Sequence, residues 1–428
     1  MSSKDSESDK TSGNVAPTQE QTVWLNRNVV GMSVTSLFSD MSHEMATSIL
    51  PFFIILVGGS PAIVGLIEGA ADGVSSAVKA YSGHFSDKIG KRTPIMYLGY
   101  VLTGILIPAI GFATSWTEVL VLRVAGWMGR GARGPPRDAL LTESTPANSR
   151  GKAFGFQRSF DTIGATIGPA IALLLIPYLP YSQIFFVAFI PGIISAAVVL
   201  VFVKDIKKRG LVQARSFRAS VSHLSRSFKL FLIGVGLFGI ANFSNVLFTL
   251  RAEEVLQPSL GEKGASELAV LLYVILNVVY ALSSFPAGMM ADRFPKRYLL
   301  AIGYVLFALA CIVSMFEVPY FPILLAIFIL AGFHTGVVDT LEGAFAADLL
   351  DAPERGAGFG VLQTVNGIGD FVSSAMIGIL WTFLSPAIGF ATTATMAIIA
   401  AALLMLFTQA KYLNGNPRST IASQTGLS

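Results

Sequence analysis

The sequence has few of the residues with which proteins usually form disulfides, bind metals or catalyse reactions in water. Its 428 residues include one cysteine, Cys311, and four histidines. A single cysteine excludes an intrachain disulfide, and four scattered histidines do not predict a metal site. No P-loop, GxSxG or HExxH motif occurs, so we expect neither an enzyme nor an ATP-driven pump. We accordingly expect no cofactor.

Charged residues are also scarce. Asp, Glu, Lys and Arg make up 13% of the chain, whereas a soluble domain carries about 25%. Apolar residues make up 53%, and the mean hydropathy is +0.64. This composition predicts an integral membrane protein and gives no sign of nucleic-acid binding. The first 28 residues are polar and contain no apolar core of a cleavable signal peptide.

Long apolar runs dominate the rest of the chain. A helix needs about 20 apolar residues to cross a bilayer, and twelve segments meet this requirement. The sequence therefore predicts an all-α membrane protein with twelve transmembrane helices. Their predicted spans are 29–56, 62–86, 94–113, 117–140, 154–177, 182–203, 229–251, 266–291, 298–316, 320–346, 357–383 and 386–410.

The positions of Lys and Arg predict how the chain is oriented. The longest connection, residues 204–228, is strongly basic, and the loops after the second and eighth helices carry further Lys and Arg. The positive-inside rule puts these loops in the cytoplasm. Because the number of helices is even, both termini are then cytoplasmic. We interpret residues 251–265 as the one long outer loop, and we expect the protein in the inner or plasma membrane.

The chain also repeats itself at a constant spacing of 205 residues. One matching pair is Phe38-Ser39-Asp40 and Phe243-Ser244-Asn245. The repeat predicts two pseudo-symmetric six-helix bundles inserted with the same orientation, an arrangement in which substrate binds between the halves. The predicted organisation is a polar tail (1–28), the first bundle (29–203), a basic linker (204–228), the second bundle (229–410) and a second tail (411–428).

Ionisable residues inside the membrane segments form the candidate transport pathway. A charge at mid-bilayer costs about 2.5–3.5 kcal/mol, so such residues are expected to face protein or water. Helices three, six, nine and twelve have almost none and are predicted to face lipid. The candidate residues for the substrate and proton pathway are Asp40, Glu44, Asp72, Arg130, Arg133, Asp161, His334, Asp339, Glu342 and Asp370.

Two chemical roles follow from these residue types. A partly desolvated carboxyl group can exchange a proton near neutral pH. Arg123, Arg130 and Arg137 are spaced by seven residues, so they form one stripe that favours a substrate with an anionic group. The alternative is a set of static ion pairs that hold the first bundle together, with Glu68, Lys79, Arg123 and Arg158 as members. His334 is either a substrate contact or a polar residue satisfied within a helix interface.

The segment from Gly83 to Arg92, GHFSDKIGKR, resembles the signature motif of the major facilitator superfamily, G-x-x-x-D-[RK]-x-G-[RK]-[RK]. It recurs from Gly288 to Arg297, with Pro295 in place of the glycine. The resemblance implies a carrier that works by alternating access. It also implies gating by Gly83, Asp87, Lys88, Gly90, Lys91, Arg92, Gly288, Asp292 and Arg293, with a simple topology anchor as the alternative. Lys91 and Arg92 are expected to hold this turn at anionic lipid headgroups.

Further segments resemble the same family. Gly164, Gly168 and Pro169 resemble the antiporter motif G-x-x-x-G-P-x-x-G of its fifth helix, with Ala172 in place of the last glycine. In the family this motif marks exporters more often than importers; the alternative is a close helix contact. Arg123 resembles the arginine of the fourth-helix motif R-x-x-x-G, but Trp127 stands at the glycine position. The segments 40–45 and 130–139 resemble a largely uncharacterised prokaryotic branch of the superfamily.

Three functions are consistent with these patterns. The first is a proton-coupled exporter of small organic or amphipathic compounds, favoured by the membrane acids and the helix-five motif. The second is a proton symporter or facilitator for uptake of a sugar, organic acid or other anion, favoured by the arginine stripe. The third is a transporter-like membrane receptor or sensor. The expected partners are the lipid bilayer, a small-molecule substrate and protons, and we expect a monomer.

Overall fold

The computed structural model describes residues 23–146, 149–206, 224–350 and 355–414. Most of the predicted tails and of the basic linker therefore lies outside the described residues. Within these ranges the chain is helical and has no strand, so the predicted all-α, twelve-helix fold is confirmed. The helices are α1 (Arg27–Leu56), α2 (Pro61–Ile89), α3 (Thr93–Ala109), α4 (Trp116–Glu143), α5 (Arg150–Leu175), α6 (Tyr181–Phe202), α8 (Arg226–Gly239), α9 (Val246–Arg293), α10 (Lys296–Ser314), α11 (Phe321–Leu349), α12 (Arg355–Phe383) and α13 (Pro386–Asn414), with a short 3₁₀ turn at Ile110–Phe112.

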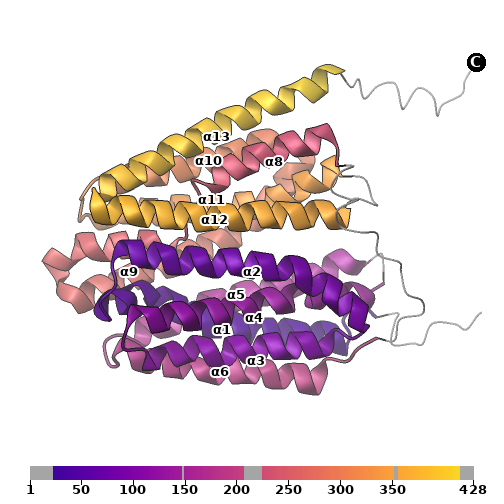
Figure 1. Ribbon diagram of the computed structural model, residues 1–428, viewed down its shortest axis with the longest axis horizontal. Coiled ribbons are helices and arrows are strands. Elements are labelled where there is room, and N and C mark those ends of the chain that lie inside the picture. Colours follow the sequence, from indigo (N-terminus) through magenta and orange to yellow (C-terminus); the bar gives the residue numbers. More distant parts are fainter. Residues whose placement is uncertain (1–22, 147–148, 207–223, 351–354, 415–428) are drawn as a thin grey trace, which may run out of the picture.

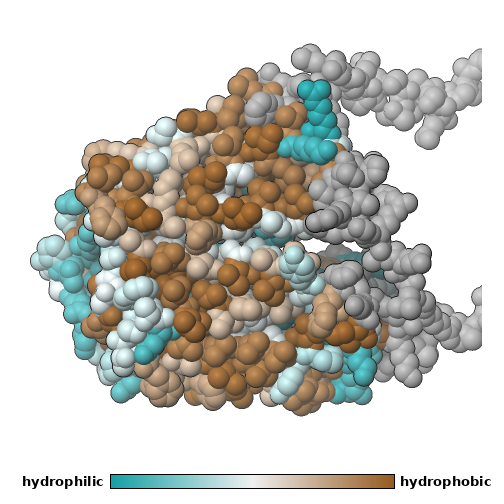
Figure 2. Space-filling model, in the orientation of Figure 1, coloured by the Kyte–Doolittle hydropathy of each residue, from teal (hydrophilic) through white to brown (hydrophobic). Residues whose placement is uncertain are grey.

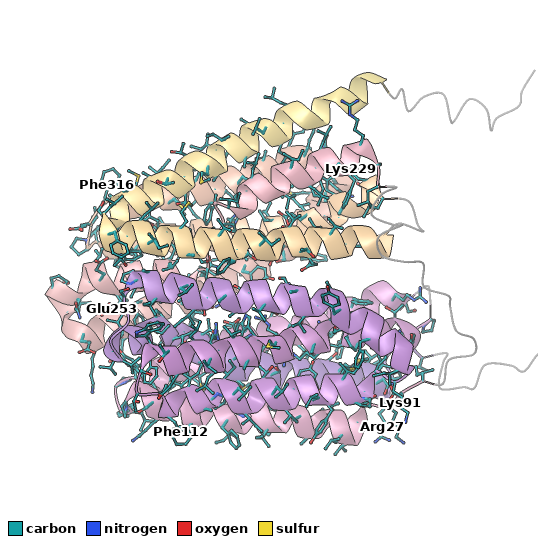
Figure 3. The ribbon with its side chains drawn as sticks, in the orientation of Figure 1. Arg27, Lys91, Phe112, Lys229, Glu253 and Phe316 are labelled. Carbon is teal, nitrogen blue, oxygen red and sulfur yellow. The ribbon has the colours of Figure 1, made fainter. Side chains whose placement is uncertain are left out.

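The helices form two halves, α1–α6 and α8–α13, that lie side by side (Figure 1). In the N-terminal half α1 packs on α5 and α6, and α3 packs on α4 and α6. In the C-terminal half α8 packs on α12 and α13, and α10 packs on α11 and α13. The two halves thus repeat one packing pattern. We call the end with Arg27, Lys91 and Lys229 the basic end, and the end with Phe112, Glu253 and Phe316 the opposite end (Figure 3).

Local signals explain where several helices begin and end. The side chain of Asn26 accepts hydrogen bonds from the N–H groups of Asn28 (3.1 Å) and Val29 (3.2 Å), which caps the first turn of α1. Gly90 ends α2 with a φ of 70°, a left-handed conformation that favours glycine. The motif glycine therefore has a backbone role in the turn between α2 and α3.

The seventh membrane segment differs from the prediction. The prediction of an uninterrupted helix over 229–251 is wrong, because α8 ends at Gly239 and α9 begins at Val246. The outer loop expected over 251–265 is also wrong: α9 is helical on both sides of a bend at Gly261, whose φ is 70°. Only glycine adopts such a φ readily, so one residue is sufficient for the bend. Polar side chains in the 240–245 gap compete for backbone hydrogen bonds and favour the break.

The outer surface is largely apolar, as Figure 2 shows on one face. Large apolar side chains on α3, α6, α10 and α13 are exposed, including Ile105, Ile190, Ile302 and Ile398. In the described part of the chain, six helices are long and apolar enough to cross a membrane by composition alone: α3, α6, α9, α10, α11 and α13. Most of the remaining helices carry the inward-facing ionisable residues, which lower their mean hydropathy.

Glycines allow the two halves to approach closely at the opposite end. Gly65, Gly69 and Gly73 of α2 lie against α12, where a β-carbon added at Gly69 would be 2.8 Å from the backbone oxygen of Phe371. Toward the basic end, Tyr81 and Phe85 of α2 are 77% and 56% exposed. Figure 2 shows a recess between the halves on that side. The halves are therefore closed together at the opposite end and apart at the basic end.

Candidate functional site

A cavity of about 300 Å³ lies between the two halves. Its walls come from α1, α2 and α4 of the N-terminal half, and from the 240–245 break, α9, α11 and α12 of the C-terminal half. Five acids and two arginines line it, so its side-chain charge is predominantly negative. These residues are Glu44, Glu68, Asp72, Asp339, Asp370, Arg123 and Arg130.

Six of the ten predicted pathway residues lie on this cavity: Glu44, Asp72, Arg130, His334, Asp339 and Asp370. The other four do not line it: Asp40, Arg133, Asp161 and Glu342. Glu342 contacts residues behind the wall, since it accepts hydrogen bonds from Asn366 (2.8 Å) and Tyr304 (3.3 Å). The structure thus brings six predicted residues from both halves together at one cavity. Their roles in transport stay predictions.

Arg123 and Glu68 form a buried ion pair in the cavity wall. The guanidinium donates to both carboxylate oxygens of Glu68, at 2.8 and 3.1 Å, and to the hydroxyl of Thr47 at 3.1 Å. Trp127 lies under the guanidinium, with its ring centroid 3.4 Å from the Arg123 Cζ atom. The tryptophan at the family's glycine position therefore stacks on the arginine and also donates to Asp72 at 2.9 Å. These bonds support the static-pair interpretation for Arg123 and Glu68.

Breaking this pair is expected to destabilise the fold. Arg123→Gln leaves the Glu68 carboxylate buried without its cation, which should cost about 3–5 kcal/mol. The double variant with Glu68→Gln should recover much of this loss, because no buried charge then lacks a partner. Thermal unfolding in detergent measures both effects. As a control, Glu317→Gln should change stability by less than about 1 kcal/mol, because Glu317 is 77% exposed. Equal loss in the single and double variants would contradict this account.

Arg130 differs from the other arginines of α4. In the part of the chain that the structure describes, it has no carboxylate within ion-pair distance, and its Cζ atom lies 5.2 Å from the centroid of the Trp127 ring. Arg133 lies 3.6 Å from Asp40, and Arg137 lies 3.0 Å from Asp138 and 3.7 Å from Asp161. The predicted stripe is therefore not one continuous anion-binding row. Among these arginines, Arg130 lines the cavity without an ion-pair partner in the described part of the chain, so it is available to bind a ligand there.

The break between α8 and α9 supplies part of the opposite wall. Asn242 lies between two predicted pathway residues: its amide nitrogen is 3.5 Å from Asp370, and its amide oxygen is 3.2 Å from Nε2 of His334. The other ring nitrogen of His334 lies 2.9 Å from the backbone oxygen of Gly303. Sequence reasoning missed this segment. The available signal was the group of polar residues at 242–245 inside an otherwise apolar run.

Tyr273 of α9 was also missed, because the candidate residues were sought among the ionisable side chains inside the membrane segments. Its hydroxyl donates to Glu44 at 2.9 Å, from α9 of one half to α1 of the other. Ser244 makes a second connection of this kind, donating to Glu68 at 3.1 Å. Neutral donors of the C-terminal half thus contact acids of the N-terminal half at the cavity.

Comparison with known proteins identifies the family to which this architecture belongs. The sequence profile described as Major Facilitator Superfamily matches residues 32–276 and 233–426. The chain belongs to the major facilitator superfamily. It is therefore a multi-pass membrane protein that transports a small solute, and not an enzyme.

Three relatives show what kinds of transporter resemble it. The uncharacterized MFS-type transporter MJ1317 of Methanocaldococcus jannaschii is 33% identical over 383 residues, covering 89% of this chain and 95% of the relative. The probable 4-methylmuconolactone transporter of Cupriavidus pinatubonensis is 30% identical over 214 residues (50% and 48% of the two chains). The cis,cis-muconate transport protein of Acinetobacter baylyi is 22% identical over 343 residues (77% and 81%).

Among solved structures, the fold is similar to that of a bacterial homologue of the human lysosomal transporter Spinster in an inward-facing, unoccupied conformation. The TM-score is 0.71 at 15% identity, over 92% of this chain and 98% of that chain. At this identity the likeness shows the fold alone.

The superfamily's signature motif lies at the basic end. The surroundings of Gly83 and the side chains of Asp87, Lys88 and Asp292 lie outside what the structure describes, so the gating assignment stays a prediction. Lys91 and Arg293 are exposed. Arg92 corrects the expectation of a headgroup contact: it is only 7% exposed, and it pairs with Glu143 of α4 at 2.7 Å. Arg92 therefore joins the α2–α3 turn to α4, since a buried charge requires a protein partner.

The helix-five motif of the superfamily lies where α5 crosses α1. A β-carbon added at Gly164 or Gly168 would overlap the backbone oxygens of Leu37 and Met41, respectively. Pro169 follows directly within α5. This packing supports the interpretation of the motif as a close helix contact within the N-terminal half.

Proposed function

We propose that this chain is a proton-coupled carrier of a small organic anion, working by alternating access through the cavity between its halves. The observation that carries the proposal is the position of Arg130, a cation in the cavity wall without a carboxylate partner among the described residues. Arg130 is half-buried, and a charge within the membrane segments is stabilised by a partner of opposite charge. A guanidinium binds carboxylates through paired hydrogen bonds. A substrate carboxylate would supply that partner.

The acids of the cavity support proton coupling. The lining holds five acids and two arginines, and Glu68 already neutralises Arg123. An incoming anion would add to this excess of negative charge. Protonation of one or more acids offsets the excess, since like charges and desolvation both favour the protonated form of a carboxyl group. Glu44, Asp72, Asp339 and Asp370 are the groups that we assign to this role, with Asp40, Asp161 and Glu342 behind them.

The same lining favours an organic anion over an amphipathic compound. Sites for apolar ligands are mostly lined by hydrophobic and aromatic side chains. Here Phe243, Val246, Val338 and Trp127 are the apolar contributors to a largely charged and polar wall. Two relatives are named for cis,cis-muconate, which is a small dicarboxylate, and for 4-methylmuconolactone. Proton-coupled export of amphipathic compounds is the competing hypothesis.

We further propose that the basic end faces the cytoplasm, as the positive-inside rule predicts for Lys91, Arg92 and Lys229. The protein would then lie in the inner membrane as a monomer with cytoplasmic termini. Because the halves are apart at the basic end, this conformation would exchange substrate with the cytoplasm. The signature-motif loops at that end would close it in the other conformation.

Uptake into proteoliposomes tests the proposal. We expect labelled unsaturated dicarboxylates and related organic acids to accumulate when the outside is acidified, and an uncoupler to abolish the accumulation. Sugars and amphipathic cations serve as the comparison panel. Accumulation of amphipathic cations without any of the acids would favour the competing exporter. Saturable binding of an acid without accumulation would favour a receptor.

A further inference from the structure

His43 is a buried ionisable residue of α1 that the proposed function has not used. It does not line the cavity, and its ring packs edge-on against Trp127 with the centroids 5.6 Å apart. Its Nδ1 atom lies 2.9 Å from the backbone oxygen of Ser39 and 3.5 Å from the carboxylate of Asp40. A backbone oxygen can only accept a hydrogen bond, so Nδ1 carries a hydrogen.

The other ring nitrogen faces a second carboxyl group. Nε2 of His43 lies 3.3 Å from Oε1 of Glu44. If neither atom carried a proton, the nitrogen lone pair would face a carboxylate in a buried place, which is unfavourable. The pair therefore holds one proton, either on the imidazole, as an imidazolium within ion-pair distance of Glu44, or on the carboxyl group as an acid. His43 and Glu44 are thus a proton-sharing pair, with Glu44 facing the cavity.

Charged groups on the surrounding helices also act on this pair. Arg130 and Arg133 of α4 and Asp161 of α5 interact electrostatically with the carboxyl groups that flank the imidazole. Arg123 of α4, paired with Glu68 of α2, donates to Thr47 one turn further along α1. Helices α3 and α6 contain no charged residue between Thr93 and Ala109 or between Tyr181 and Phe202. Acids and arginines therefore both surround the pair. When the pair holds one proton, the positive and negative charges of these side chains nearly cancel.

The remaining oxygen of Glu44 contacts the other half of the protein. Tyr273 of α9 donates its hydroxyl hydrogen to Oε2 at 2.9 Å. A hydrogen bond to an ionised carboxylate is roughly twice as strong as one to a neutral group. Tyr273 is twelve residues beyond Gly261, so it lies about 18 Å from the bend of α9 near the opposite end. This contact is on the closed side of the molecule, where the two halves meet.

We propose that His43 and Glu44 hold a coupling proton, and that Tyr273 links its presence to closure of the two halves at the opposite end. With one proton on the imidazole, Glu44 is ionised and the bond from Tyr273 is charge-assisted. A second proton, entering from the cavity, neutralises Glu44 and weakens that bond. The inference rests on the proton coupling of the proposed function and adds the groups that hold the proton and transmit its effect.

Distance measurements between the halves test this link directly. Spin labels at Phe112→Cys and Phe316→Cys, both at the opposite end (Figure 3), report its opening in a Cys311→Ser background. In lipid nanodiscs we expect the population with the longer distance to rise by about five- to tenfold as the pH falls from about 8 to about 5, because a charge-assisted bond is lost.

Three variants are expected to change this profile in different ways. Tyr273→Phe removes the bond, so the open population should be high at every pH. Glu44→Gln imitates the protonated acid and should give the same result. His43→Gln removes the positive partner of Glu44, so the midpoint of the profile should move to higher pH. Tyr181→Phe is the matched control: it removes a bond of 2.9 Å between α6 and Ser266 of α9 that involves no carboxylate, and it should keep the wild-type profile.

The outcomes separate this inference from the proposed function. Wild-type pH profiles in Tyr273→Phe, Glu44→Gln and His43→Gln would overturn the inference, even if the liposomes show proton-coupled uptake. A loss of pH dependence in Tyr181→Phe as well would also overturn it, because any bond between the halves would then be sufficient. The expected profiles without anion uptake in liposomes would support the inference and overturn the anion assignment.

Discussion

Arg130→Gln is expected to raise the Kd of the transported anion by at least about 30-fold while leaving the protein folded. The reason is that a buried charge pair contributes about 2 kcal/mol or more to binding, and every 1.4 kcal/mol is a tenfold change in Kd. Arg130 has no carboxylate within ion-pair distance among the described residues, so its loss breaks no direct ion pair. Binding of a labelled acid to the purified protein measures the effect.

Two further variants decide how Arg130 acts. Arg130→Lys keeps the charge but loses the planar fork, so it should bind the acid with an intermediate Kd. Glu317→Gln, at an exposed acid, should bind as the wild type does. Unchanged affinity in Arg130→Gln, with a normal melting temperature, would exclude Arg130 as the anion site. A large drop in melting temperature would instead show that it stabilises the fold.

Gly69→Leu is expected to slow transport strongly without unfolding either half. Gly69 lies where α2 meets α12 across the two halves, and a β-carbon there would already be 2.8 Å from the backbone oxygen of Phe371. A leucine forces the halves apart at the opposite end, and overpacking of this kind costs about 1–3 kcal/mol. The closed population should fall roughly 5- to 150-fold, and the initial uptake rate should fall with it.

A glycine contact inside one half gives the matched comparison. Gly104 of α3 packs on α6, where a β-carbon would be 2.7 Å from the backbone oxygen of Gly192. Gly104→Leu should therefore lower the yield and the melting temperature of the folded protein, and it should not open the opposite end. If Gly69→Leu transports at the wild-type rate, closure through α2 and α12 is not part of the cycle.

Much of the fold could be predicted from the sequence because the bilayer imposes simple rules. Apolar runs of sufficient length indicated the helices, and the repeat at 205 residues indicated two similar halves. The break in the seventh segment depends on distant partners that no local pattern shows. Ser373 of α12 donates to the backbone oxygen of Asn242 at 2.7 Å, and Ser374 accepts from the N–H of Ser244 at 3.1 Å.

The site was predicted less completely, and the arginines of α4 show why. Their spacing of seven residues placed them on one stripe, but the neighbouring helix changes along the length of α4. Arg123 meets Glu68 of α2, Arg133 meets Asp40 of α1, and Arg137 meets Asp161 of α5. Periodicity along one helix does not determine which helix lies opposite each turn. For this reason Arg130 could not be distinguished from its neighbours before the structure.

Neutral residues account for most of the remaining omissions. A search for charges inside the membrane finds Glu44 and Asp370, but it passes over Tyr273 and Asn242, which contact them from α9 and from the break before it. Such neutral donors are common in proteins, and only their position next to an acid identifies these two as part of the site. These neutral polar residues of the site could therefore be identified only from the three-dimensional structure.

The most direct test of proton-coupled anion transport is to record proton movement and substrate movement together. A pH-sensitive dye inside proteoliposomes reports proton entry when a carboxylic acid that binds the protein is added outside with no imposed gradient. The account predicts proton entry that depends on the acid, disappears in Arg130→Gln, and does not occur with the methyl ester of the same acid. Equal proton entry with the ester, or acid uptake without any proton entry, would contradict it.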